Sequence, residues 1–112
     1  MKLGGVKVVA GIAFAGACAA HGPADVDTQV KLGMAAYHRV CAQCHGRDAI
    51  STNAIPDLRH MTPETRAEFM DIVLQGKRLQ KGMANFADMV TPAEADDINF
   101  YLIARAREDY NK

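Results

Sequence analysis

The sequence contains no tryptophan and has no excess of charge, because 13 Lys and Arg residues balance 13 Asp and Glu residues over its 112 positions. This balance gives no indication of a nucleic acid or another polyanion as partner. Apart from one run near the N-terminus, no stretch approaches the roughly 20 apolar residues that a transmembrane helix needs. Repeats, low-complexity tracts and convincing strand patterns are absent too. The sequence therefore predicts one small all-α domain.

The first 20 residues have the layout of an export signal. Lys2 and Lys7 accompany an apolar run over residues 8–17, and small residues follow. Cleavage would remove both lysines and leave 11 basic against 13 acidic residues, a net charge of −2. We therefore expect a signal peptide at 1–20, a mature domain at 25–110 and a periplasmic location. The alternative is a buried N-terminal helix.

Cys18 lies at the end of this segment, and two cleavage points fit the small residues around it. Cleavage near Ala17-Cys18-Ala19 would remove the cysteine with the signal. Cleavage after Ala15-Gly16-Ala17 would leave Cys18 at the new N-terminus, and this arrangement resembles a bacterial lipobox. Membrane attachment is therefore expected only if Cys18 carries a lipid.

The other two cysteines stand in the pentapeptide Cys41-Ala42-Gln43-Cys44-His45. Cys-x-x-Cys-His is the attachment pattern of haem c. Positions i, i+3 and i+4 share one face of a helical turn, so both thiols can bond porphyrin vinyl groups while the imidazole of His45 reaches the iron. The sequence thus predicts one haem c, bound covalently through Cys41 and Cys44, with His45 as an iron ligand.

Three other interpretations of this motif remain open. A thioredoxin-like thiol pair needs a βαβ setting. A short structural disulfide needs an oxidising compartment. A zinc site needs a second Cys or His pair at suitable spacing, which His21, His38 and His60 do not form.

Hydrophobic periodicity and capping residues predict three main helices. The first covers residues 27–40 and runs straight into the motif. The second covers 63–75, with Thr62 as N-cap and Pro63 at its first position. The third covers 92–107 and begins with a capping box made by Thr91 and Glu94. The apolar stripes of these helices consist of Val30, Gly33, Met34, Tyr37 and Cys41, of Phe69, Met70, Ile72 and Val73, and of Ala95, Ile98, Tyr101 and Leu102.

Two long loops, at 46–61 and 76–91, remain between the predicted helices. Long loops without structure of their own are unusual in so small a domain. Here both can wrap a flat apolar cofactor that supplies the missing part of the core.

The methionines suggest how the second axial position of the iron is filled, because a thioether opposite a histidine is typical of electron-carrying haem proteins. Met34 and Met70 lie on helical stripes and are expected in the core. Met61 follows His45 by only 16 residues, so the chain would have to turn sharply to reach the opposite face of the haem.

Met83 and Met89 lie in the loop before the last helix, which is the natural crossover to the far side of the haem. We favour Met83, because Gly82 and Ala84 leave the backbone room to approach the porphyrin. Met89 is the alternative.

Two further residues are expected at the cofactor. Phe86 can pack on the porphyrin ring. The carbonyl of Pro56 can accept a hydrogen bond from the second ring N–H of His45, which would fix the tautomer of the imidazole. The alternative for Pro56 is an ordinary loop proline.

The residues taken together resemble class I cytochrome c, with particular likeness to the cytochrome domain of bacterial quinohaemoprotein alcohol dehydrogenases. The resemblance spans residues 28–107. It is carried by YHRVCAQCHG at 37–46, PDLR at 56–59, GMANF at 82–86 and DINFYLIARA at 97–106.

The resemblance implies a small class I cytochrome c fold, with three main helices and long loops around one covalent haem. It implies Cys41 and Cys44 as thioether anchors, with His45 and Met83 as the two iron ligands. It also implies that Gly33 meets Tyr101 where the first and last helices cross.

The expected function is transfer of single electrons, without catalytic residues, between a periplasmic dehydrogenase or membrane complex and an oxidase or cytochrome acceptor. The large domain of the dehydrogenases is missing, so no alcohol oxidation is implied. Lys77, Arg78 and Lys81 can steer an acidic redox partner, unless they simply form a solvated loop. The alternatives are a haem enzyme or gas sensor with an open distal position, and a haem-free thiol oxidoreductase.

Overall fold

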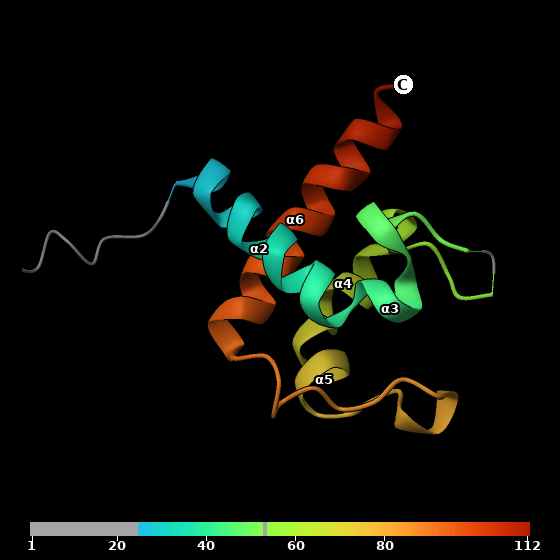
Figure 1. The fold of residues 1–112 in the computed structure, drawn as a ribbon. Coiled ribbons are helices and arrows are strands. Elements are labelled where there is room, and N and C mark those ends of the chain that lie inside the picture. Colours follow the sequence, from blue (N-terminus) through green and yellow to red (C-terminus); the bar gives the residue numbers. More distant parts are fainter. Residues whose placement is uncertain (1–24, 53) are drawn as a thin grey trace, which may run out of the picture.

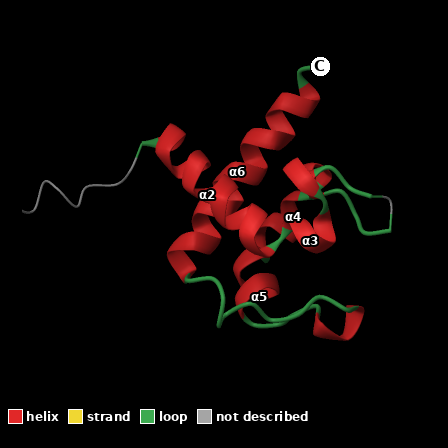
Figure 2. Cartoon of the chain, viewed as in Figure 1, coloured by secondary structure: helices red, strands yellow, loops and turns green. Residues whose placement is uncertain are grey.

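The computed structural model describes residues 25–52 and 54–112, so the expected signal peptide and Cys18 lie outside the described residues. The described part contains helices and loops and no strand, which confirms the all-α prediction (Figure 2). No helix within these ranges is long and apolar enough to cross a membrane. The α-helices are α2 (Val26–Val40), α3 (Ala42–His45), α4 (Pro63–Ala67), α5 (Phe69–Leu74) and α6 (Pro92–Tyr110).

The first and last helices each begin at a residue whose side chain caps the helix. The carboxylate of Asp25 accepts a hydrogen bond from the Thr28 N–H at 2.8 Å and starts α2. Thr91 and Glu94 form the predicted capping box of α6, with both hydrogen bonds at 3.1 Å. Such reciprocal bonds satisfy amide groups that a helix start would otherwise leave unpaired. Helix α6 ends at Tyr110, three residues beyond the predicted end.

Helices α2 and α6 cross at Gly33 (Figure 1). A Cβ atom on Gly33 would lie 1.9 Å from the backbone oxygen of Asp97 and 2.9 Å from the Cβ of Tyr101. The expected contact between Gly33 and Tyr101 is therefore confirmed. Only glycine lets the two backbones come this close, which outweighs its cost of about 1 kcal/mol inside a helix.

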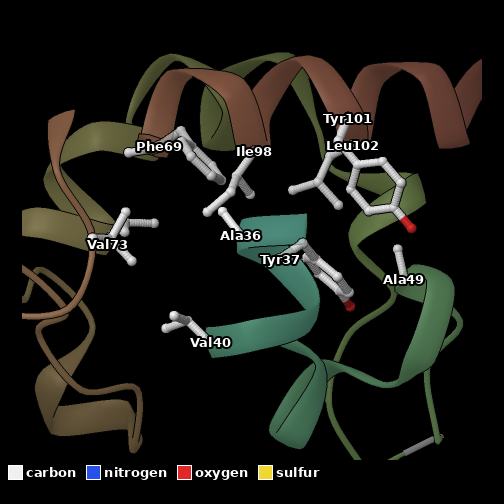
Figure 3. Packing of buried hydrophobic residues seen from close by; sticks show 11 residues of the cluster. Ala36, Tyr37, Val40, Ala49, Phe69, Val73, Ile98, Tyr101 and Leu102 are labelled. Atoms are coloured by element: carbon white, nitrogen blue, oxygen red, sulfur yellow. The ribbon is translucent and has the colours of Figure 1, made fainter. Parts of the chain in front are cut away.

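The core lies between these two helices and is completed by α5 and the loop after α3. In Figure 3, Tyr37 of α2 faces Tyr101 and Leu102 of α6, with Ala49 beside them. The four predicted core residues of α6 are all buried, and they are Ala95, Ile98, Tyr101 and Leu102. The hydroxyl of Tyr37 donates to the carbonyl of Gly46 at 2.6 Å, which ties α2 to the chain after the motif.

Two predicted core methionines are exposed instead. Met34 and Met70 have 42% and 37% of their surface accessible. The buried residues of α2 are Gly33, Ala36, Tyr37 and Val40, so the centre of its apolar stripe is turned away from Met34. Periodicity located the stripe but did not fix its edge, because the exact rotation of a helix depends on its neighbour.

The predicted helix at 63–75 is divided into α4 and α5. The N-cap at Thr62 is present, but Glu68 has non-helical angles (φ −96°, ψ 6°) and separates the two pieces. Helix α4 buries no residue, whereas α5 buries Phe69, Ile72 and Val73. Because of this break, α5 packs its apolar side chains against the core while α4 lies at the surface. No glycine or proline marks this position in the sequence.

The two long loops contain short 3₁₀ helices, namely η1 (Arg47–Ala49), η2 (Leu58–His60) and η3 (Leu79–Lys81). The second loop is attached to α5, because the Phe86 N–H donates to the carbonyl of Val73 at 2.8 Å. Both loops are visible in Figure 2, the first between α3 and α4 and the second between α5 and α6. Neither is structureless.

Candidate functional site

The motif, the two long loops, α5 and α6 enclose a cavity of about 380 Å³. Its volume is in the range of small-molecule and cofactor sites. Phe69, Val73, Ile98 and Leu102 contribute to its apolar walls. The structure brings all six sequence-predicted site residues to this one cavity, and they are Cys41, Cys44, His45, Pro56, Met83 and Phe86.

The motif forms one tight turn between α2 and the short helix α3. The amides of Cys44 and His45 both donate to the carbonyl of Cys41, at 3.2 Å and 3.0 Å. These bonds set the three side chains at the helical spacing that the motif requires. Cys41 is half-buried and Cys44 is exposed.

The two thiols are not bonded to each other. Burial raises the pKa of the Cys41 thiol to about 11. A thiol oxidoreductase needs the opposite shift, because the thiolate is the reactive form. The described residues also include no strand that could supply a βαβ setting. These observations argue against the thiol oxidoreductase interpretation.

His45 differs from the sequence-based expectation in one contact. Its Nδ1 atom is buried and has no hydrogen-bond partner, so the expected bond to the carbonyl of Pro56 is not formed. Pro56 is exposed and lines the cavity. A buried polar atom without a partner is costly. Because Nδ1 is the buried atom, a group bound in the cavity would reach the imidazole through its other nitrogen, Nε2.

Burial also lowers the pKa of His45, which favours the neutral imidazole. The neutral form is the one that binds metals. Across residues 25–52 and 54–112, no cluster of three or more His, Cys, Asp or Glu side chains could hold a metal ion. The zinc interpretation therefore lacks a ligand set, whereas a single imidazole beside two thiols in an apolar cavity fits haem c.

Met83 reaches the cavity from the loop before α6. Gly82 precedes it with φ +95°, and a Cβ atom there would meet nothing within 4 Å. The glycine is thus needed for its left-handed backbone angle rather than for space, which differs from our reason for expecting it. The Met83 N–H donates to the carbonyl of Arg78 at 3.2 Å and closes the turn.

Two other methionines, Met89 and Met61, differ from each other in whether they line the cavity. Met89 is 56% exposed and does not line the cavity. Met61 is half-buried and lines the cavity together with Met83. Met61 is therefore the methionine nearest in role to Met83, and a substitution at each can distinguish them.

The three basic residues before Met83 divide into two groups. Lys77 pairs with Glu68, with the two charged atoms 2.7 Å apart. Arg78 and Lys81 line the cavity. Only these two place positive charge at the cavity itself.

A cluster of charges that no sequence pattern indicated holds the loop with Pro56. Arg59 contacts the carboxylates of Asp57 at 2.6 Å and Asp109 at 2.8 Å, and Asp109 also contacts His60 at 2.9 Å. The guanidinium of Arg59 lowers the pKa of Asp57 to about 2. The cluster fastens η2 to the last turn of α6, and no local pattern could pair residues 50 positions apart.

Comparison with known proteins decides the family. A model of the family described as cytochrome c oxidase, cbb3-type, subunit III, matches residues 28–102. The chain belongs to this family of c-type cytochromes. Membership implies one covalently bound haem c and a role in electron transfer, and the residues around the cavity fit both.

The relatives of this cytochrome include much larger enzymes. Quinohemoprotein alcohol dehydrogenase ADH IIB of Pseudomonas putida is 43% identical over 73% of this chain, and the match covers 12% of the enzyme. Cytochrome c550 of Pseudomonas aeruginosa is 36% identical over 68% of this chain and 55% of its own length. The cytochrome thus spans about one eighth of the first relative.

A solved structure shares the fold of this cytochrome. Quinohemoprotein alcohol dehydrogenase ADHIIG from Pseudomonas putida HK5 superposes with a TM-score of 0.75 at 37% identity. The match covers 81% of this chain and 13% of the enzyme chain. The expected small cytochrome c fold and the likeness to quinohaemoprotein dehydrogenases are both confirmed.

Proposed function

We propose that this cytochrome holds its haem in the 380 Å³ cavity and passes single electrons from a periplasmic dehydrogenase to an oxidase or cytochrome acceptor. Cys41 and Cys44 would form the thioether bonds, and His45 and Met83 would hold the iron. When bound, haem supplies an Fe(III)/Fe(II) couple that gains and loses one electron. The observation that carries this proposal is the meeting of two thiols, an imidazole and a thioether at one apolar cavity.

The iron ligands and the basic residues at the cavity together favour exchange of electrons with a protein partner. If His45 and Met83 both hold the iron, it would have no position left for a substrate, and the chain would act as an electron carrier. Arg78 and Lys81 at the cavity give positive charge that would attract an acidic redox partner. Lys77 contributes less, because Glu68 neutralises it. Export of the chain, with or without a lipid on Cys18, belongs to the same proposal.

The function is tested by producing the full chain in a bacterium that assembles haem c. We expect a coloured protein that stains for haem on a denaturing gel and whose mass exceeds the processed polypeptide by one haem. It should be reduced and reoxidised reversibly, and its ferrous form should not bind carbon monoxide rapidly. A colourless product of bare polypeptide mass would refute haem attachment. Rapid carbon monoxide binding by the coloured protein would instead indicate an enzyme or gas sensor with an open iron position.

Met83→Ala should open one side of the iron. We expect the ferric charge-transfer band in the red, which reports methionine bound to iron, to disappear. The reduction potential should fall by about 0.1 V, since axial ligands adjust haem potentials over roughly 0.8 V. Absorption spectroscopy and a redox titration measure the two effects.

Met61→Ala is the matched control for Met83→Ala, because Met61 lines the same cavity. It removes an equal volume of side chain and should leave the band in place. If the band survives in Met83→Ala and disappears in Met61→Ala, the assignment of the ligand is wrong.

A further inference from the structure

A second hollow, of about 520 Å³, lies at the C-terminal end of α6 against η2 and α4. It shares no lining residue with the haem cavity. The last turns of α6 project beyond the other helices at this end of the molecule (Figure 1).

One wall of this hollow is an apolar stripe that the core does not use. Ile103, Ala106 and Tyr110 follow one another at spacings of three and four residues and share one face of α6. The buried stripe of the same helix ends at Leu102. Tyr110 is 90% exposed. An exposed tyrosine next to aliphatic side chains is typical of a protein interface.

The opposite side of the hollow carries Arg59, Arg66 and the carboxylate of Asp109, and of the two arginines only Arg66 has no charged partner in the described part of the chain. Arg59 is satisfied by two carboxylates, those of Asp57 and Asp109. Arg66 is half-buried, and its guanidinium donates to the amide oxygen of Asn99 at 2.9 Å. Among residues 25–52 and 54–112, no carboxylate lies within ion-pair distance of Arg66. A guanidinium withdrawn from water without a counter-ion is unfavourable and favours an incoming anion.

We propose that this hollow docks an acidic protein partner. A carboxylate of the partner would pair with Arg66, and a neighbouring apolar side chain would cover Ile103, Ala106 and Tyr110. Arg and Tyr are among the residues that contribute most to binding energy when an interface buries them. An anionic membrane fits less well, because it is recognised by clusters of about four to eight exposed cations rather than by one half-buried cation in a concave site.

This docking face goes beyond electron transfer and does not depend on it. The face shares no residue with the haem cavity, so a partner bound there leaves Arg78 and Lys81 accessible to a redox partner. The cytochrome could thus be held on one protein while it exchanges electrons with another.

The test uses the complete haem-loaded protein and a fluorescein-labelled peptide, Glu-Leu-Asp-Phe, with its C-terminus amidated. Fluorescence anisotropy at low salt measures binding. We expect the acidic peptide to bind and the matched peptide Gln-Leu-Asn-Phe not to bind. Arg66→Gln should weaken binding about tenfold, which corresponds to about 1.4 kcal/mol. Arg66→Lys should retain part of the affinity, because it keeps the charge but loses the fork of donors.

Arg47→Gln is the matched control, because Arg47 is exposed, lines neither cavity and loses the same charge. Equal weakening by both substitutions would mean that only net charge matters, and would overturn the proposal. If Arg66→Gln fails to fold by circular dichroism, Tyr110→Ser replaces it and should weaken binding to a similar extent.

The experiment can also distinguish two other occupants of the hollow, a second copy of the chain and a lipid surface. A dimer in sedimentation that Arg66→Gln dissociates would show a second copy of the chain in the hollow. Binding to phosphatidylglycerol vesicles that depends on Arg66, without binding of the peptide, would show a lipid surface. Either result would overturn the proposal of an acidic protein partner.

Discussion

Serine at both positions 41 and 44 should abolish covalent attachment of haem. A hydroxyl group cannot replace a thiol in forming a thioether bond, and the two cysteines stand at the cavity on one helical turn. Haem staining after denaturing electrophoresis and the intact mass measure the result. We expect no stain and the mass of the bare polypeptide, whereas each single substitution leaves one possible thioether.

The double substitution should also lower stability sharply. Without the cofactor, a cavity of about 380 Å³ must either collapse or admit water against apolar walls. Exposure of these apolar walls to water would remove a large share of the roughly 5–15 kcal/mol that holds a typical domain together. The helical signal in circular dichroism should therefore weaken and melt over a broad range of temperature.

Gln43→Ser is the control for this experiment. Gln43 is exposed and lies between the two cysteines without lining the cavity. The Gln43→Ser variant should stain for haem and should have the haem-loaded mass and the melting temperature of the parent protein. Persistence of covalent haem in the double serine variant would show that the attachment site is elsewhere in the chain.

The parts of the fold that follow from sequence are those with local causes. Thr62, Thr91 and Glu94 accept hydrogen bonds from amides only three residues away, so the starts of these helices can be predicted from the local sequence. The haem motif is equally local, since one turn of helix holds its three side chains together. Met83 was expected at the cofactor because of its place in the loop before α6, and the structure places it at the cavity.

The parts that could not be predicted depend on residues far apart in the chain. The pairing of Arg59 with Asp109 requires η2 to meet the last turn of α6. The exposure of Met34 depends on how α2 is rotated against α6, and the break at Glu68 follows no local signal. The basic residues of the second hollow, likewise, come together only when α4, η2 and α6 are packed.

Gly33→Ala should destabilise this cytochrome severely, although helix propensity alone predicts the opposite. Alanine is favoured over glycine inside a helix by about 1 kcal/mol. Here the added methyl carbon would stand 1.9 Å from the oxygen and 2.5 Å from the carbon of the Asp97 carbonyl group. These are backbone atoms in the middle of α6, so no side chain can rotate to relieve the clash, and α2 and α6 would have to separate.

Separation of α2 and α6 would loosen the ring contact of Tyr37 with Tyr101, whose centroids lie 5.3 Å apart, and would uncover part of the core. Overpacking usually costs about 1–3 kcal/mol, and we expect about 3–5 kcal/mol here because the obstacle is backbone. For a domain of this size that lowers the melting temperature by roughly 15–30 °C. Thermal unfolding followed by circular dichroism measures it, with Ala35→Ser on the exposed face of α2 as a control that adds one atom without a clash. A Gly33→Ala variant as stable as the parent would mean that the two helices do not cross at this glycine.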